Sequence, residues 1–197
     1  EDRNRQLTGY MEKTFGISPA ETRQAINVAD AAEKQFHDEM HRAGKAVLDE
    51  VTANGSYAVI LASRPYQNDA LVNHDLPEMF TSLGIPVLTA DSLEEAVNKV
   101  EDAANDNVIM DIVNNYHARM LSTAILTARN PHLEYVQIVS FGCGHDAYLS
   151  DEIIRLMKEI SGKTPLVLKL DESDIQGPLR IRVRSFTETV SMNHAIH

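Results

Sequence analysis

Two stretches of the chain carry most of the side chains that could do chemistry. Residues 63–69 read SRPYQND and offer a guanidinium, a phenol and an amide. Residues 142–146 read GCGHD and place a thiol between two glycines, followed by an imidazole and a carboxylate. Each stretch directly follows an apolar run of strand length, so each is expected to form a loop at the end of a buried strand.

Cys143 is the residue with the widest chemical range. As a thiolate it could ligate a metal or act as a nucleophile, and the flanking glycines allow a ligand to approach closely. A nucleophile would need a base, for which His145 and His74 are the candidates. The structural alternative is a small side chain in a cramped turn. His74, next to Asp75, could also form an acid–base pair or cap a short helix.

Arg64 and Tyr66 could together hold a phosphate or a carboxylate through guanidinium and hydroxyl donors. Asn68 is expected to shape the same crevice. The alternative role for Arg64 is structural, with its guanidinium tying the loop to Asp69 or Asp75.

Histidines and arginines outside these two stretches could also bind ligands. His37 and His41 are four residues apart on an expected helix, which suits a two-histidine metal face. Their segment reads HDEMH and lacks the zinc-protease pattern, so a solvated or packing role is favoured. Arg180, Arg182 and Arg184 could meet an anion near a helix N-terminus or pair with acidic neighbours. His194 and His197 lie in a tail expected to fray.

Strand-like and helix-like segments must position these loops, and they alternate along the chain. Apolar runs predict strands at 57–62, 85–89, 135–141 and 166–170. Helices are expected at 76–83, from 92 (with a Ser92–Glu95 capping box), at 108–129, at 150–160 with Ser150 as cap, and from Pro178 onward. This alternation predicts an α/β fold with a Rossmann-like or flavodoxin-like parallel sheet of about four strands. For this sheet we assume the strand order 2-1-3-4.

The first 54 residues lack strand signals and are expected to form an N-terminal helical segment. A helix covers 3–14, and a second begins at Ser18-Pro19, where Ser18 and Glu21 have capping-box spacing. Asn54-Gly55 ends that helix. Two domains are therefore predicted, a helical segment at 1–54 and an α/β domain at 55–197.

The expected strand order brings the two loops together. Ligands of open α/β sheets bind beyond the carboxyl ends of strands where the strand order reverses. Strands one and three flank that point in the order 2-1-3-4. Arg64 and Cys143 are therefore expected to open on one cleft.

Composition excludes several classes of function. The chain has 197 residues, one cysteine and a net charge of −11. A lone cysteine forms no intrachain disulfide and fits a reducing compartment such as the cytoplasm. The acidic charge disfavours nucleic acid and anionic membrane as partners. No segment approaches a membrane span, no signal peptide is recognised, and the phosphate-loop, dinucleotide and serine-elbow motifs are absent.

Two long stretches of the chain resemble a known family. RPYQNDALVNHDLPEMFTSLGIPVLTADS and VQIVSFGCGHDAYLSDEIIRLMKEISGKTPLVLKLDESDIQGPLRIRVRSF are similar to signature regions of large CoA-substrate-specific enzyme activase-like proteins. Those proteins are related to the activators of 2-hydroxyacyl-CoA dehydratases and benzoyl-CoA reductases. The present chain resembles the dehydratase-component-like part.

The resemblance implies a longer parent, an iron–sulfur protein of anaerobic bacteria. There an ATPase part passes a low-potential electron to a [4Fe–4S] cluster in the dehydratase-like part. Cys143 would supply one cluster ligand, while Arg64, Tyr66, Asn68, His74 and His145 would line the crevice. The expected partners are other domains of the parent or a partner subunit. A CoA thioester substrate and a homodimer are left open.

One cysteine cannot hold a cluster in the usual way, and no ATP site is recognised, so the chain alone is expected to be inactive and free of a cluster. The parent is expected to be an ATP-dependent activase or reductase-type protein. The alternative is a non-redox module that binds a small anion or CoA, or that serves assembly, with a structural Cys143.

Overall fold

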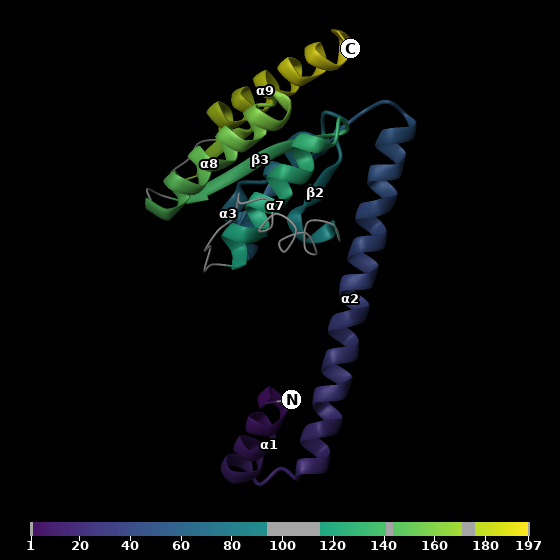
Figure 1. Ribbon diagram of the computed structural model, residues 1–197, viewed down its shortest axis with the longest axis vertical. Helices are drawn as coiled ribbons and strands as arrows, with labels where there is room; N and C mark the ends of the chain where they lie inside the picture. Colours follow the sequence, from purple (N-terminus) through teal and green to yellow (C-terminus); the bar gives the residue numbers. More distant parts are fainter. Residues whose placement is uncertain (1, 94–114, 141–143, 171–175, 197) are drawn as a thin grey trace. The chain divides into compact units, whose positions relative to one another are not determined.

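The computed structural model describes residues 2–93, 115–140, 144–170 and 176–196 (Figure 1). Their elements, in chain order, are α1 (Asp2–Phe15), α2 (Pro19–Ala53), β1 (Ala58–Ala62), the 3-10 helix η1 (Pro65–Asn68), α3 (Ala70–Asn73), α4 (Leu76–Thr81), β2 (Val87–Thr89), η2 (Ala90–Ser92), α7 (Asn115–Arg129), β3 (Leu133–Ser140), α8 (Gly144–Ser161), β4 (Leu166–Leu170) and α9 (Gln176–Ile196). The chain divides into two compact units, residues 1–42 and 43–197.

The first unit is a pair of helices, α1 and the first part of α2. The capping box predicted at the start of α2 is present: the Glu21 amide donates to Ser18 Oγ at 3.2 Å, and the Ser18 amide donates to Glu21 Oε2 at 3.3 Å. The Arg3 guanidinium donates to both carboxylate oxygens of Asp30 at 2.9 and 2.8 Å, joining the two helices. Ile26 is buried within this unit.

A four-stranded sheet forms the second unit. All strand pairs are parallel and the order is β2-β1-β3-β4, which confirms the predicted topology. Every residue of β1 is buried, as expected for a strand covered on both faces. The register aligns Ala62 of β1 with Gln137 of β3, so the carboxyl ends of these two strands meet at one edge.

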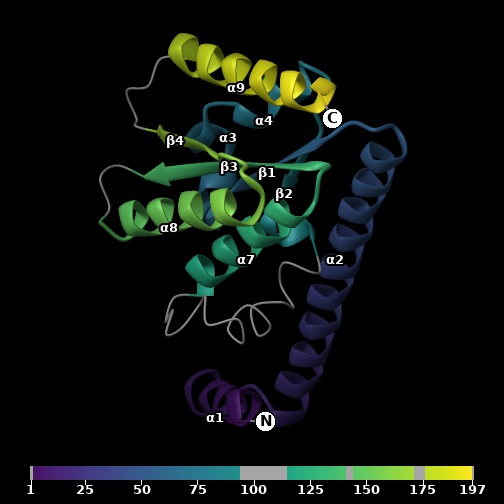
Figure 2. The same cartoon turned by 45° about the horizontal axis from the view of Figure 1, so that its top comes forward.

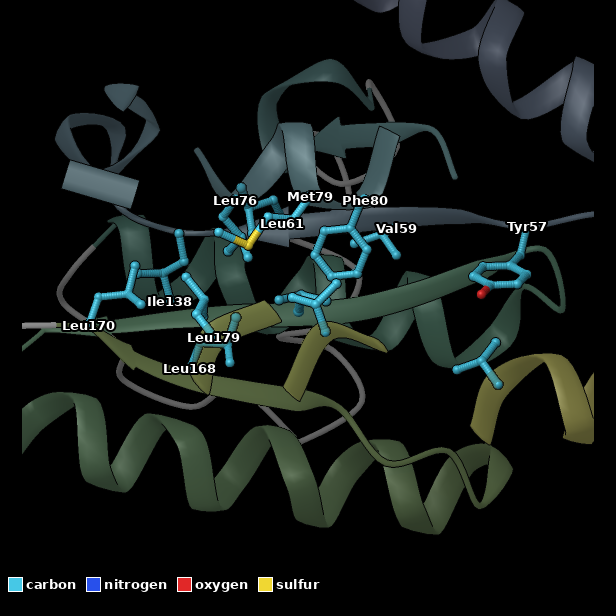
Figure 3. Packing of buried hydrophobic residues seen from close by; sticks show 13 residues of the cluster. Tyr57, Val59, Leu61, Leu76, Met79, Phe80, Ile138, Leu168, Leu170 and Leu179 are labelled. Carbon is cyan, nitrogen blue, oxygen red and sulfur yellow. The ribbon is translucent and has the colours of Figure 1, made fainter. Parts of the chain in front are cut away.

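Helices cover both faces of this sheet (Figure 2). On one face, β1 and β3 pack against α4 and α9 through a cluster that includes Leu61, Phe80, Leu168 and Val183 (Figure 3). On the other face, Ala62 and Tyr135 pack against side chains of α7 and α8. The predicted helical tail is confirmed: α9 begins at Gln176, with Pro178 in its first turn.

Two predicted helix starts, at Ser150 and at Ser92, have different outcomes. The helix expected to begin at Ser150 begins at Gly144, so Ser150 as the cap is wrong. Ser150 lies inside α8, and its Oγ donates to the Asp146 carbonyl at 2.7 Å, one helical turn earlier. A serine can form this bond inside a helix as readily as it can cap one. Ser92 donates from Oγ to the Thr89 carbonyl at 2.7 Å, while Glu95, the other half of that box, lies outside the described residues.

The charged side chains of Lys163 and Glu134 lie buried at the amino-terminal edge of the sheet. Lys163 Nζ donates to the Leu133 and Asn130 carbonyls at 2.6 and 2.8 Å, and lies 3.3 Å from Glu134 Oε1. Burial lowers the pKa of Lys163. His194 Nε2 lies 3.5 Å from the same Glu134, and its ring stacks on Tyr57 with centroids 5.1 Å apart.

His194 was expected to fray, and instead its ring packs against the sheet. His197 lies outside the described residues. None of the described helices combines the length and the apolar content that crossing a bilayer requires.

The contact between α2 and η2 gives a test of this packing. Gly44 is buried in α2, and a β-carbon added there would overlap the backbone carbonyl of Ser92. In an open helix position, Gly→Ala stabilises by roughly 0.5–1 kcal/mol. We expect Gly44→Ala to destabilise instead, by about 1–3 kcal/mol, because the backbone must move to relieve the overlap.

Urea denaturation followed by circular dichroism measures this difference. Gly9→Ala in α1 is the matched control, because nothing lies within 4 Å of the added β-carbon. A Gly44→Ala protein as stable as the parent protein would show that α2 and η2 do not pack this closely.

Candidate functional site at the carboxyl edge of the sheet

One ion pair joins the loop after β1 to the helix after β3. Arg64 Nη2 lies 2.5 Å from Asp146 Oδ1, and the two side chains are only 22% and 6% exposed. Arg64 is the residue before η1, and its amide donates to Gln67 Oε1 at 2.8 Å, which fixes the backbone where the side chain leaves it. The segment 63–69 therefore contacts the start of α8 through this ion pair.

Asp69 and Asp75 were the predicted structural partners of Arg64, whereas the ion pair in the structure is with Asp146. Asp69 instead caps α3, accepting from the Leu71 amide at 2.9 Å. Burial makes the pair with Asp146 consequential, since an unpaired charge at such a position would be costly.

Two histidines lie beside this ion pair. The His117 and His145 rings have centroids 6.1 Å apart, with His117 from the first turn of α7 and His145 from the first turn of α8. Burial lowers the pKa of His117, and the positive charge of Arg64 lowers it further. Asp146 acts in the opposite direction. The neutral imidazole, which can accept and donate a proton, is therefore favoured there.

His117 was not among the residues predicted from the sequence. The predicted residues lie in the two loops that follow strands, whereas His117 comes from a helix that begins at the same edge. Chain direction could have identified it, because a helix that precedes a strand in an α/β unit starts at the carboxyl edge of the sheet. Its first residues, such as Tyr116 and His117, belong to that edge.

The other predicted residues have separate positions in the loop after β1. Tyr66 is exposed. Asn68 Oδ1 accepts from Ser63 Oγ at 2.7 Å, so its amide stabilises the loop itself. His74 follows α3 in the left-handed region with φ 55°.

Cys143 lies outside the described residues, so its side chain and the predicted cleft with Arg64 stay predictions. It is covalently joined to Gly144, the first residue of α8, and is three residues before Asp146. Within the described ranges, no three His, Cys, Asp or Glu side chains are grouped as a metal site would require.

Gln137 is an unexpected polar group beneath this edge. It is fully buried in β3, and neither its amide oxygen nor its amide nitrogen has a hydrogen-bond partner. On the same face, two residues earlier, Tyr135 donates to the Met120 carbonyl at 2.8 Å. Gln137 therefore lies nearer the carboxyl edge than this bond, on the side covered by α7 and α8.

Several large apolar side chains remain in solvent around the same edge. Leu71 is 90% exposed and Tyr148 is 82% exposed, and Tyr66 and Tyr116 are also exposed. They come from α3, α8, η1 and α7. Exposed apolar groups gathered around a polar centre are typical of a surface that contacts another molecule.

The electrostatics of His117 predict a pH dependence. Its pKa in the folded chain should lie below the ordinary value of about 6.5, and Asp146→Asn should lower it further by removing the favourable negative charge. Because the unfolded chain takes up this proton first, the free energy of unfolding should fall as pH drops from about 6.5 toward the lowered value.

A titration of the imidazole proton resonances by NMR measures this pKa. His117→Gln should flatten the stability curve in that pH range. A His117 pKa at or above the ordinary value would contradict the geometry.

The unpartnered Gln137 gives a separate prediction for stability. Gln137→Met keeps the volume and removes two unsatisfied polar atoms, so it should stabilise the fold by roughly 1–3 kcal/mol. Gln35→Met on the exposed face of α2 is the control, because that side chain already bonds to Glu39 at 2.8 Å. Thermal melts report the difference, and a clear loss of stability in Gln137→Met would show that the amide is satisfied.

Comparison with known proteins adds one finding. Residues 1–93 match a family model described as a CoA enzyme activase uncharacterised domain (DUF2229). No curated protein and no solved structure matches the chain. The matched residues run from α1 through η2 and include the loop that carries Arg64. This match supports a CoA-enzyme-activase-like relationship for residues 1–93.

Proposed function

We propose that this chain is a dehydratase-component-like α/β domain of a CoA-enzyme activase-like protein, and that it works through the carboxyl edge of β1 and β3. The observation that carries the proposal is the buried ion pair between Arg64 and Asp146. It draws the loop after β1 onto the helix that begins one residue after Cys143. The match of residues 1–93 supports the activase relationship.

An iron–sulfur cluster is the cofactor that the resemblance implies, and this chain alone does not fit it. Such clusters ordinarily take four thiolates, whereas the whole sequence contains one cysteine. In the proposal Cys143 supplies one ligand, and the remaining ligands come from outside these residues. The ATP-driven electron transfer then belongs to the complete assembly and not to this chain.

In the proposal Cys143 lies at this edge, where Arg64 and two histidines supply hydrogen-bond donors. Arg64 is a permanent cation, and His117 and His145 add ring nitrogens that can donate. The exposed side chains Leu71 and Tyr148 give this edge an apolar rim for contact with other domains or a partner subunit.

The second candidate function is a module that binds a small anion or a CoA group without redox chemistry. The observation that favours it is the single cysteine, which would then be structural. In this case the donors of Arg64, Tyr66 and His145 would hold the anionic group.

Substitution of the thiol separates the two candidates. In the polypeptide that carries this sequence, purified without oxygen, Cys143→Ser should lower the iron bound per chain and weaken the broad visible absorbance. The matched control is Lys158→Ser, an exposed position in the last turn of α8. It should leave the iron content unchanged.

Equal iron in Cys143→Ser and in the parent protein would overturn the ligand role and favour the binding module. A far-ultraviolet circular dichroism spectrum of each variant shows that the fold is intact. The experiment thus separates loss of a ligand from loss of structure.

A further inference from the structure

A groove of about 300 Å³ lies on the opposite face of the sheet from the Arg64–Asp146 pair, between α4 and α9. Its apolar lining is Met79, Leu83 and Val183. Val183 and Met79 belong to the core cluster that Figure 3 displays, so the floor of the groove is the outer surface of the core.

Opposite charges line the two sides of this groove. Arg180 and Arg184 come from α9, while Asp75 and Glu78 come from the start of α4. Among the described residues, neither arginine forms an ion pair with a carboxylate, so the expected pairing with acidic neighbours is wrong for these two residues. Arg155 on α8 shows the contrast, since it pairs with both Glu152 and Glu159.

Gln176 keeps one pair of these charges apart. Its amide nitrogen donates to Asp75 Oδ2 at 3.4 Å, and its amide oxygen accepts from Arg180 Nη2 at 3.3 Å. A neutral side chain therefore bridges an anion and a cation at the end of the groove. Glu78 and Arg184, farther along their helices, lack such a bridge among the described contacts.

The backbone is strained where Asp75 meets the groove. His74 and Asp75 have φ values of 55° and 58°, and neither is glycine. Two successive left-handed residues reverse the chain so that Leu76 is fully buried while Asp75 stays in solvent. Strain of this kind is typical of positions that hold a functional side chain in place.

Arg182, which lies between Arg180 and Arg184 in the sequence, does not line the groove. Arg182 donates from Nη2 to the Val167 carbonyl of β4 at 2.6 Å. Residues four apart share one face of a helix, whereas a residue two positions away lies on the other side. Arg180 and Arg184 are thus directed to the groove, and Arg182 to the edge strand.

We propose that this groove binds a small dipolar molecule, one that carries a carboxylate and an ammonium group joined by a short alkyl chain. Arg180 and Arg184 would hold the carboxylate, and Glu78 and Asp75 the ammonium group. The alkyl chain would lie on Met79 and Leu83. A purely anionic ligand is disfavoured because it would face Asp75 and Glu78 across the same groove.

The size of the groove agrees with this class of ligand, since small-molecule sites begin at about 300 Å³. The inference goes beyond the proposed function and is independent of it. It uses the other face of the sheet and no residue of the Arg64–Asp146 site.

The test uses 6-aminohexanoate as the dipolar probe, with acetate and hexylamine as probes for each charge alone. Two-dimensional NMR of the ¹⁵N-labelled chain follows the amides of α4 and α9. We expect saturable shifts with 6-aminohexanoate, and affinity at least about tenfold weaker for acetate or hexylamine, since each lacks one of the two charge contacts.

Matched variants identify the residues that bind. Arg180→Ala/Arg184→Ala and Glu78→Gln should each weaken 6-aminohexanoate binding about tenfold or more, while Arg182→Ala should leave it unchanged. All the substituted side chains are exposed, so the fold should survive, and circular dichroism checks this for each variant.

Three results would overturn the proposal. They are the absence of saturable shifts with 6-aminohexanoate, acetate binding as strongly as 6-aminohexanoate, and an equal loss of binding in Arg182→Ala. Because none of these measurements involves Cys143 or iron, failure here leaves the proposed function untouched, and the converse also holds.

Discussion

The burial of β1 and β3 on both faces is the constraint on which the rest of this α/β unit depends. Parallel strands of this kind expose no face to water, so each face requires its own layer of helices. The amphipathic helices α7 and α8 cover one face, and α4 and α9 cover the other. The helices α4, α7 and α8 lie in crossover connections between strands, whereas α9 follows the last strand and packs on the same face as α4. The carboxyl ends of β1 and β3 meet at one edge of the sheet.

Charge is concentrated where this layered arrangement ends. At the carboxyl edge, Arg64 and Asp146 form a buried pair with two histidines alongside. At the amino-terminal edge, Glu134 lies between Lys163 and His194. The two clusters differ in use. Lys163 donates to backbone carbonyls at the end of α7 and the start of β3, whereas the two imidazoles at the carboxyl edge lie with their ring centroids 6.1 Å apart.

The helices on the two faces of the sheet also differ in whether their charged side chains form ion pairs. Beside α7 and α8, opposite charges meet in short contacts, as in Arg64–Asp146 and Arg155–Glu152. Between α4 and α9, Arg180, Arg184 and Glu78 remain apart around a groove. Exposed ion pairs contribute little to stability. The separated charges therefore cost the fold little and leave the groove able to bind a dipolar molecule.

Local sequence signals were enough for the elements and their order. The apolar run at β1, the capping box of Ser18 and Glu21, and the apolar stripe of α9 all act within a few residues. Alternation of strand and helix then predicted a parallel sheet, whereas the order 2-1-3-4 was an assumption that the structure confirms. The same reasoning misjudged Ser150, because a serine inside a helix and one at its start satisfy the same short pattern.

The partners of the polar side chains were decided only by the tertiary structure. Arg64 and Asp146 are 82 positions apart, and no spacing rule distinguishes Asp146 from the nearer Asp69 or Asp75. His117 joins the site because α7 begins at the carboxyl edge, and Arg182 differs from Arg180 only by where α9 packs. Hydrophobic periodicity determined what each segment becomes, since that depends on neighbours along the chain. Which charged side chains form ion pairs depends on how segments far apart in the sequence pack together, and local sequence patterns do not determine that packing.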